Sequence, residues 1–117
     1  SHYNTPIVQD DGPRGRSRVW GDASKLVQTL AIEAIRDEAI KAGFSKQQQA
    51  MVLAIAYIES GFNPDAAAGT TSAQGLGQFI RRTGKHYGLD ESNRWNIREQ
   101  ARALVLGHWS LPRSRIR

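Results

Sequence analysis

Residues 50–61 read AMVLAIAYIESG, and this stretch decides which fold the chain can adopt. It holds almost no polar atoms as far as Ile58, which is typical of a helix buried in the centre of a small domain. Gly61 can end that helix because glycine takes the left-handed conformation easily. Upstream, Ser45 and Gln48 have the spacing of a capping box, so we expect the helix to begin just after Ser45.

Glu59 is the one acidic side chain in this stretch, and it stands at the predicted C-terminal end of the helix. The apolar helix excludes water from the carboxyl, and the helix end directs partial negative charge toward it. Both effects are expected to raise the pKa of Glu59, and a carboxyl that keeps its proton near neutral pH suits general-acid catalysis. The alternative is a surface glutamate that only ends a buried helix.

A second helix is predicted upstream, from Asp22 or Ser24, which are both good capping residues, to Gly43. Its apolar residues recur with helical spacing and form a stripe that can face a core. The stripe has two adjacent rows, Leu26, Leu30 and Ala34 in one and Val27, Ala31 and Ile35 in the other.

The rest of the chain also favours helices. They are predicted for residues 76–82, for the residues after Thr83, and for about residues 96–109. No run alternates as a strand does, and a small β-hairpin between Ala66 and Ala73 is the one exception that we keep open. We therefore predict an all-α domain with a central buried helix over residues 22–117, preceded by an irregular arm over residues 1–21.

The composition is that of one soluble domain with a modest core, with 117 residues, 39% of them apolar and 23% charged. The absence of cysteine excludes disulfides and thiolate metal sites. No apolar run approaches the roughly 20 residues that span a bilayer. No signal peptide is visible, and because the sequence starts at Ser1 without methionine we expect a trimmed or processed terminus.

The chain is basic, with a formal net charge of +5, which favours polyanionic partners. Its basic residues gather in three clusters: Arg14, Arg16 and Arg18; Arg81, Arg82, Lys85 and His86; and Arg113, Arg115 and Arg117. Anionic cell-wall polymers and outer-membrane head groups are candidate partners, and a solvated basic surface is the alternative. No aromatic residues interleave with the clusters, so we do not expect a nucleic acid partner.

Two motifs follow one another at a fixed separation. Residues 54–64 read AIAYIESGFNP, and residues 70–79 read TTSAQGLGQF. In this order and spacing they resemble the soluble lytic transglycosylase family, which shares its core fold with goose-type lysozyme, and within it the bacteriophage endolysin branch. The resemblance covers about residues 45–109 and implies a lysozyme-like helical fold.

The resemblance also implies roles for individual residues. Glu59 matches the catalytic acid/base of the family, and Ser60 matches the serine that helps to hold the substrate or the carboxyl. Gln78 matches a glutamine whose polar groups face the sugar chain, and Phe79 matches a core position beneath the cleft. The family cleaves the β-1,4 bond between N-acetylmuramic acid and N-acetylglucosamine in peptidoglycan, needs no metal or cofactor, and acts at the bacterial wall, in the periplasm or from a phage virion.

A single glutamate can suffice for this chemistry when the substrate supplies the other groups. The family course is a transglycosylation, in which the glutamate protonates the leaving oxygen and then takes a proton from the C6 hydroxyl of the same sugar, closing an anhydro ring. Most glycosidases instead use two carboxylates, and Asp65 is the other acid near Glu59. If Asp65 positions a water, hydrolysis becomes the alternative; its plainer role is to stabilise a turn.

This chain departs from the family pattern at two places. Gly77 replaces a methionine, which we expect to widen a subsite of the cleft. The Ala-Tyr-Asn motif, whose tyrosine helps to orient the glutamate, is absent; Tyr57, Tyr87 or His108 replaces it, or another segment or partner completes the cleft. No His, Asp or Glu set has metal-ligand spacing. Besides the transglycosylase, a lysozyme-type hydrolase and a non-catalytic wall-binding domain remain open.

Overall fold

The computed structural model describes residues 23–67 and 72–107 and contains four helices over these ranges. They are α1 (Lys25–Lys41), α2 (Lys46–Ser60), α3 (Arg81–His86) and α4 (Ile97–Gly107). The all-α class is therefore confirmed. The predicted arm over residues 1–21, two of the three basic clusters, and His108 and Trp109 lie outside the described residues.

Helix α1 begins where the sequence predicted, because the Ser24 hydroxyl accepts a hydrogen bond from the backbone nitrogen of Val27 at 3.2 Å. It buries the row that contains Val27, Ala31 and Ile35. The neighbouring row is only partly buried, since Leu26 is 54% exposed. The predicted stripe therefore faces the core, except at Leu26 in the first turn.

Helix α2 has the predicted capping box: Gln48 N donates to Ser45 Oγ at 3.1 Å, and Ser45 N donates to Gln48 Oε1 at 2.8 Å. It ends at Gly61, which has a φ of 60°. The expectation of a central buried helix is met on one side of α2 only. Only one face is buried, by Val52, Ile55 and Ala56, whereas the opposite face is exposed at Met51, Tyr57 and Ile58.

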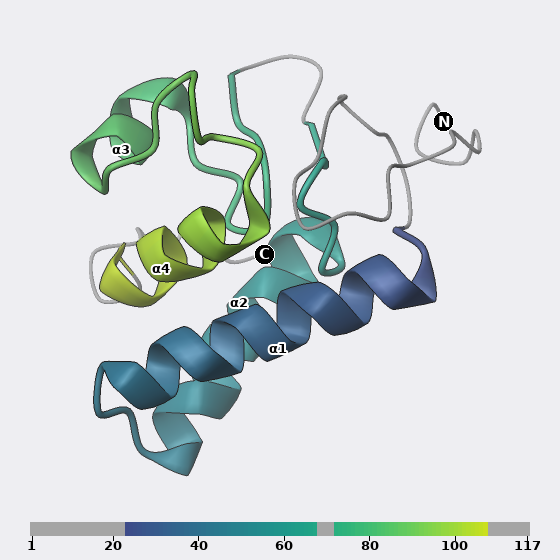
Figure 1. Cartoon of the computed structure of the whole chain (residues 1–117), viewed down its shortest axis with the longest axis vertical. Coiled ribbons are helices and arrows are strands. Elements are labelled where there is room, and N and C mark those ends of the chain that lie inside the picture. The colour runs from purple at the N-terminus through teal and green to yellow at the C-terminus, as the bar shows by residue number, and fades with distance from the viewer. Residues whose placement is uncertain (1–22, 68–71, 108–117) are drawn as a thin grey trace.

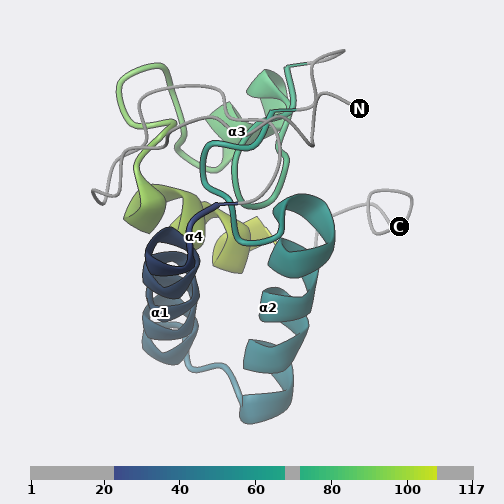
Figure 2. The same ribbon diagram turned by 90° about the vertical axis from the view of Figure 1, so that its right-hand side faces the viewer.

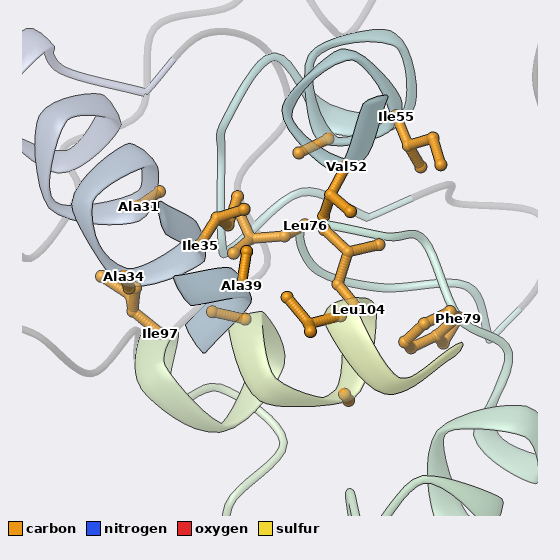
Figure 3. Close-up of a cluster of buried hydrophobic side chains, with 14 of the residues drawn as sticks. Ala31, Ala34, Ile35, Ala39, Val52, Ile55, Leu76, Phe79, Ile97 and Leu104 are labelled. Atoms are coloured by element: carbon orange, nitrogen blue, oxygen red, sulfur yellow. The ribbon is translucent and has the colours of Figure 1, made fainter. Parts of the chain in front are cut away.

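Helices α1 and α2 stand side by side, joined at one end by residues 42–45, while the loops and α3 lie beyond the other end (Figures 1 and 2). Helix α1 packs against both α2 and α4, but α2 and α4 make little direct contact with each other. Residues of the loop after α2 fill the space between them. Figure 3 shows Leu76 in the middle of the core, among side chains of α1, α2 and α4.

The segment between α2 and α3 differs from its prediction. Instead of a helix over residues 76–82, residues 75–78 form a turn and α3 begins at Arg81. Gly75 at a φ of 81° and Gln78 at a φ of 51° interrupt any helix there, because both are left-handed. Two isolated antiparallel bridges, Ala67 to Gln74 and Gln74 to Phe79, are the β structure within the described residues.

None of the four helices is both long and apolar enough to cross a membrane, for the part of the chain that the structure describes.

Candidate active site

Glu59 lies in the last turn of α2, at the end of the helix that faces the loops (Figure 2). The residue is half-buried, and its carboxylate oxygen Oε2 is fully buried. This agrees with the environment expected for a general acid, in which part of the carboxyl is removed from water. The raised pKa of Glu59 stays a prediction.

The backbone leaves the helix through two consecutive left-handed residues, Gly61 and Phe62, both at a φ of 60°. For a side chain such as that of Phe62 this conformation costs roughly 1–2 kcal/mol. Phe62 and Gln78 are the non-glycine residues with positive φ in the described chain, and they lie in the two motifs. Backbone strain of this kind clusters at functional sites, where the surrounding structure enforces it.

Ser60 joins the end of α2 to the turn formed by residues 75–78. Its hydroxyl lies 3.0 Å from the carbonyl oxygen of Ala56 and 2.9 Å from that of Leu76. A hydroxyl has one hydrogen to donate, so these two carbonyls share it. The structure thus gives Ser60 a bond to the loop, and its expected contact with substrate stays a prediction.

Gln78 is turned into the loop rather than fully toward solvent, with 8% of its surface exposed. Its side-chain nitrogen Nε2 donates to the carbonyl oxygens of Gly75 at 2.9 Å and Ala66 at 3.2 Å. Both donors of the amide are therefore used to hold the turn. The expectation that the polar groups of Gln78 face the sugar chain does not hold for the nitrogen and stays a prediction for Oε1.

Gly77 does not widen the site. It is buried, and a β-carbon there would lie 3.1 Å from Leu104 Cδ1 and 3.3 Å from Phe79 Cζ. The space that a side chain would take is already filled from the core side. Phe79 itself is 3% exposed and belongs to the core, as expected.

Tyr87 follows α3 and packs against the core from that side. Its ring centroid lies 5.8 Å from that of Phe79, and its ring atoms lie 3.0 Å from where a β-carbon on Gly107 would stand. Tyr57 is on α2, is 66% exposed, and places its ring 5.8 Å from that of Phe62. Of the three suggested replacements for the missing family tyrosine, Tyr57 is therefore the one on the same helix as Glu59, and His108 lies outside the described residues.

Asp65 is only 1% exposed. Its backbone nitrogen donates to Asn63 Oδ1 at 2.9 Å, which closes a tight turn around Pro64. A carboxylate buried to this degree is poorly placed to activate water from solvent. The turn-stabilising alternative for Asp65 fits this geometry better than the catalytic one.

Two buried polar residues that organise the site were missed in the sequence. Gln100 on α4 is 3% exposed and binds the backbone at Pro64, Leu76 and Arg94. Arg94 is 5% exposed and donates to the carbonyl oxygens of Ser72 at 2.7 Å and Phe79 at 3.3 Å. A signal for Gln100 was present, because it lies one helical turn from both Ile97 and Leu104, on the apolar face.

A cavity of about 310 Å³ lies beside α3 and is lined by Arg81, Lys85, Leu89, Asp90, Glu91 and Ser92. None of the expected site residues lines it. Its rim is internally paired: Arg81 Nε lies 2.9 Å from Glu91 Oε1, and hydrogen bonds from the side chain and backbone of Ser92 lower the pKa of Asp90. The described residues include no group of three or more His, Asp or Glu side chains that could hold a metal ion.

Comparison with known proteins gives a match to a protein family. The sequence model of a family described as phage tail lysozyme matches residues 31–107, which run from the middle of α1 to the end of α4 and include Glu59 and the turn. No curated protein and no solved structure matches the chain.

Proposed function

Because this chain belongs to the phage tail lysozyme family, whose substrate is peptidoglycan, we propose that Glu59 is the general acid of its glycan-cleaving site and that the reaction is a transglycosylation. The membership makes the protein a lysozyme-like enzyme of the phage virion that acts on the cell wall. What we add is the residue that carries the chemistry and the course of the reaction.

The observation that carries the proposal is the setting of Glu59 at the end of α2. Its Oε2 is buried, and the neighbouring Ser60 binds the turn of the second motif through Leu76 O at 2.9 Å. The acid and the turn that corresponds to a sugar-facing loop are therefore held together. Proton transfer from a group fixed in this way contributes about 10²- to 10⁴-fold to a rate.

In the proposed reaction, Glu59 donates its proton to the glycosidic oxygen while the bond from that oxygen to C1 of the muramic acid breaks. The acetamido group of the same sugar stabilises the positive charge at C1. The Glu59 carboxylate then takes the proton of the C6 hydroxyl, whose oxygen bonds to C1 and forms the 1,6-anhydro ring. The glutamate ends in its starting protonation state, and no water is consumed.

The burial of Asp65 favours this course over a two-carboxylate hydrolysis, because the second acid of the motif region is only 1% exposed. Hydrolysis remains the second candidate, since lysozyme is the activity in the family's name. The two courses differ in one respect that can be measured: hydrolysis adds the elements of water to the product, and transglycosylation does not.

The test is mass spectrometry of the fragments released from purified peptidoglycan in water enriched in ¹⁸O. Transglycosylation predicts anhydro products that are lighter by one water and carry no label. Labelled reducing ends would show that the hydrolase is the correct alternative. If the walls stay intact, with no loss of turbidity at any enzyme concentration, the chain is the non-catalytic wall-binding domain.

A further inference from the structure

The peptide unit of Leu76 is bound on both sides by side chains from two different helices. Its nitrogen donates to Gln100 Oε1 on α4 at 2.8 Å, and its carbonyl oxygen accepts from Ser60 Oγ at the end of α2 at 2.9 Å. Leu76 itself is fully buried. One peptide group thus connects α4 to the residue next to Glu59.

Gln100 makes further bonds that fix its own position. Its Nε2 donates to the carbonyl oxygens of Pro64 at 2.9 Å and Arg94 at 3.0 Å. The single amide therefore joins three backbone segments: the exit from α2, the turn, and the approach to α4. Each of these groups is buried, so losing its partner would leave a polar atom unsatisfied at a cost of about 1–3 kcal/mol.

The turn is also shaped to admit this amide. A β-carbon on Gly75 would lie only 2.6 Å from Gln100 Oε1, so the side chain of Gln100 occupies the space that any other residue at position 75 would need. Gly75 has a φ of 81°, which glycine adopts without strain. The backbone approaches Gln100 closely because this residue has no side chain.

Helix α4 has no constraint on the end of α2 from direct helix packing, because α2 and α4 make little contact with each other and the turn, bound to Ser60, lies between them. The bonds of Gln100 supply that constraint from the α4 side. A misplacement of about 1 Å in a catalytic site can reduce the rate by about 10²-fold. A constraint that fixes the turn relative to Glu59 is therefore expected to affect the reaction rate.

We propose that Gln100 is a positioning residue for the reaction: it sets the place of the turn of residues 75–78 relative to Glu59, acting through the Leu76 peptide. It does not touch the substrate in this role. The inference rests on the proposed function of Glu59. It predicts that loss of the amide affects turnover more than it affects binding of the wall.

The first test replaces Gln100 by methionine, which has a similar length and no amide. With folding checked by circular dichroism, we expect turnover at saturating peptidoglycan to fall by about tenfold or more, while sedimentation with insoluble walls shows nearly unchanged binding. In hydrogen exchange, the Leu76 amide should lose protection while the amide of Val52 keeps it. These readouts separate positioning from general destabilisation.

Gln49→Met is the matched control. Gln49 also donates its side-chain amide to one backbone carbonyl, that of Phe44 at 3.1 Å, but it lies at the opposite end of α2 from Glu59. We expect its turnover to match that of the parent protein. If Gln100→Met fails to fold, Gln100→Asn is the second variant. It keeps the amide but is one methylene too short to reach all three partners. We expect its turnover to fall more than its wall binding, by a smaller factor than in Gln100→Met.

Full turnover in a folded Gln100 variant, or equal losses of turnover and wall binding, would overturn the inference. The proposed function fails by a separate result, namely undiminished wall cleavage by a folded Glu59→Gln variant. If Glu59→Gln is inactive and a folded Gln100 variant is fully active, the positioning role of Gln100 is rejected while the proposed function of Glu59 stands.

Discussion

The α1–α2 hairpin and the segment between α2 and α3 are stabilised by different kinds of contact. In the hairpin, Ser24 and Ser45 cap their helices through residues only three positions away, and apolar side chains pack between the helices. In the described residues of the segment 61–80, local bonds such as that from Gln78 Nε2 to Gly75 O are joined by bonds from distant side chains, those of Gln100 and Arg94. The hairpin is thus specified locally, whereas the shape of the segment depends on α4 and the residues before it.

This difference separates scaffold from site. Helix caps and apolar periodicity can tolerate many sequences, because each contact is small and replaceable. A buried amide that satisfies three backbone groups has no simple substitute. We therefore expect changes in the hairpin to alter stability with little effect on catalysis, and changes in the segment or at its junction with α2 to alter catalysis whether or not stability changes.

The largest effect is expected at the junction itself. Glu59→Gln removes the proton donor while keeping nearly the same shape, so the rate of wall lysis should fall by at least about 10²-fold with folding intact. Loss of turbidity of purified walls measures the effect. Glu33→Gln is the control, because Glu33 is an exposed carboxyl on α1. Equal lysis by the two variants would remove Glu59 from the mechanism.

The next-largest effect is the loss of stability when Gly75 in the segment is replaced by alanine, with Gly43 after α1 as the comparison. The two glycines have similar backbone conformations, with φ values of 81° and 79°. Alanine costs roughly 1–2 kcal/mol of unfolding free energy at either position, for its left-handed backbone. At Gly75 the β-carbon also displaces Gln100 Oε1, whereas at Gly43 nothing lies within 4 Å. Urea denaturation should therefore show Gly75→Ala as the less stable variant, by about 1–3 kcal/mol. Equal losses would mean that Gln100 adapts freely.

A smaller effect is expected within the hairpin. Ser45→Ala removes the capping box of α2 and should cost about 1 kcal/mol of unfolding free energy, as measured by urea denaturation. Ser45→Asp keeps a capping oxygen and should recover most of that loss. Well below its unfolding temperature, the alanine variant should cleave walls at the parent rate. A clear loss of turnover there would contradict the division between scaffold and site.

The smallest effect concerns the loop after α3, where the Ser92 hydroxyl and backbone, with Lys85 nearby, lower the pKa of Asp90 from its ordinary value of 3.8. A lowered folded-state pKa adds stability above the unfolded-state pKa, and this contribution is lost as pH falls through the folded-state value. The unfolding temperature of Asp90→Asn should thus be slightly lower than that of the parent protein at pH 7, and the two temperatures should converge in strong acid. A constant difference at all pH values would show that the charge of Asp90 is irrelevant.

The parts that the sequence predicted correctly are those with local signals. Ser24, Ser45 and Gly61 marked helix ends, and the motif around Glu59 indicated the family, while Glu59 as the acid stays a prediction. The failures lie where distant residues decide. Residues 76–78 were predicted as part of a helix because Gly75 and Gln78 gave no sign of their left-handed backbone, which depends on bonds with Ala66 and Gln100. The exposed face of α2 was missed because hydropathy does not reveal how many neighbours a helix has.

The three bonds of Gln100 have a consequence for protein engineering. A designer who copies only the contiguous piece from Glu59 to Phe79 onto another helical hairpin would leave the recipient without the amide that holds Pro64 O and Leu76 N. The smallest segment that can be transferred with its turn intact therefore extends to α4, although Arg94 is the one residue between Phe79 and Gln100 that the structure shows bound to that amide. A transplant should therefore be judged by whether it brings its own equivalent of this glutamine.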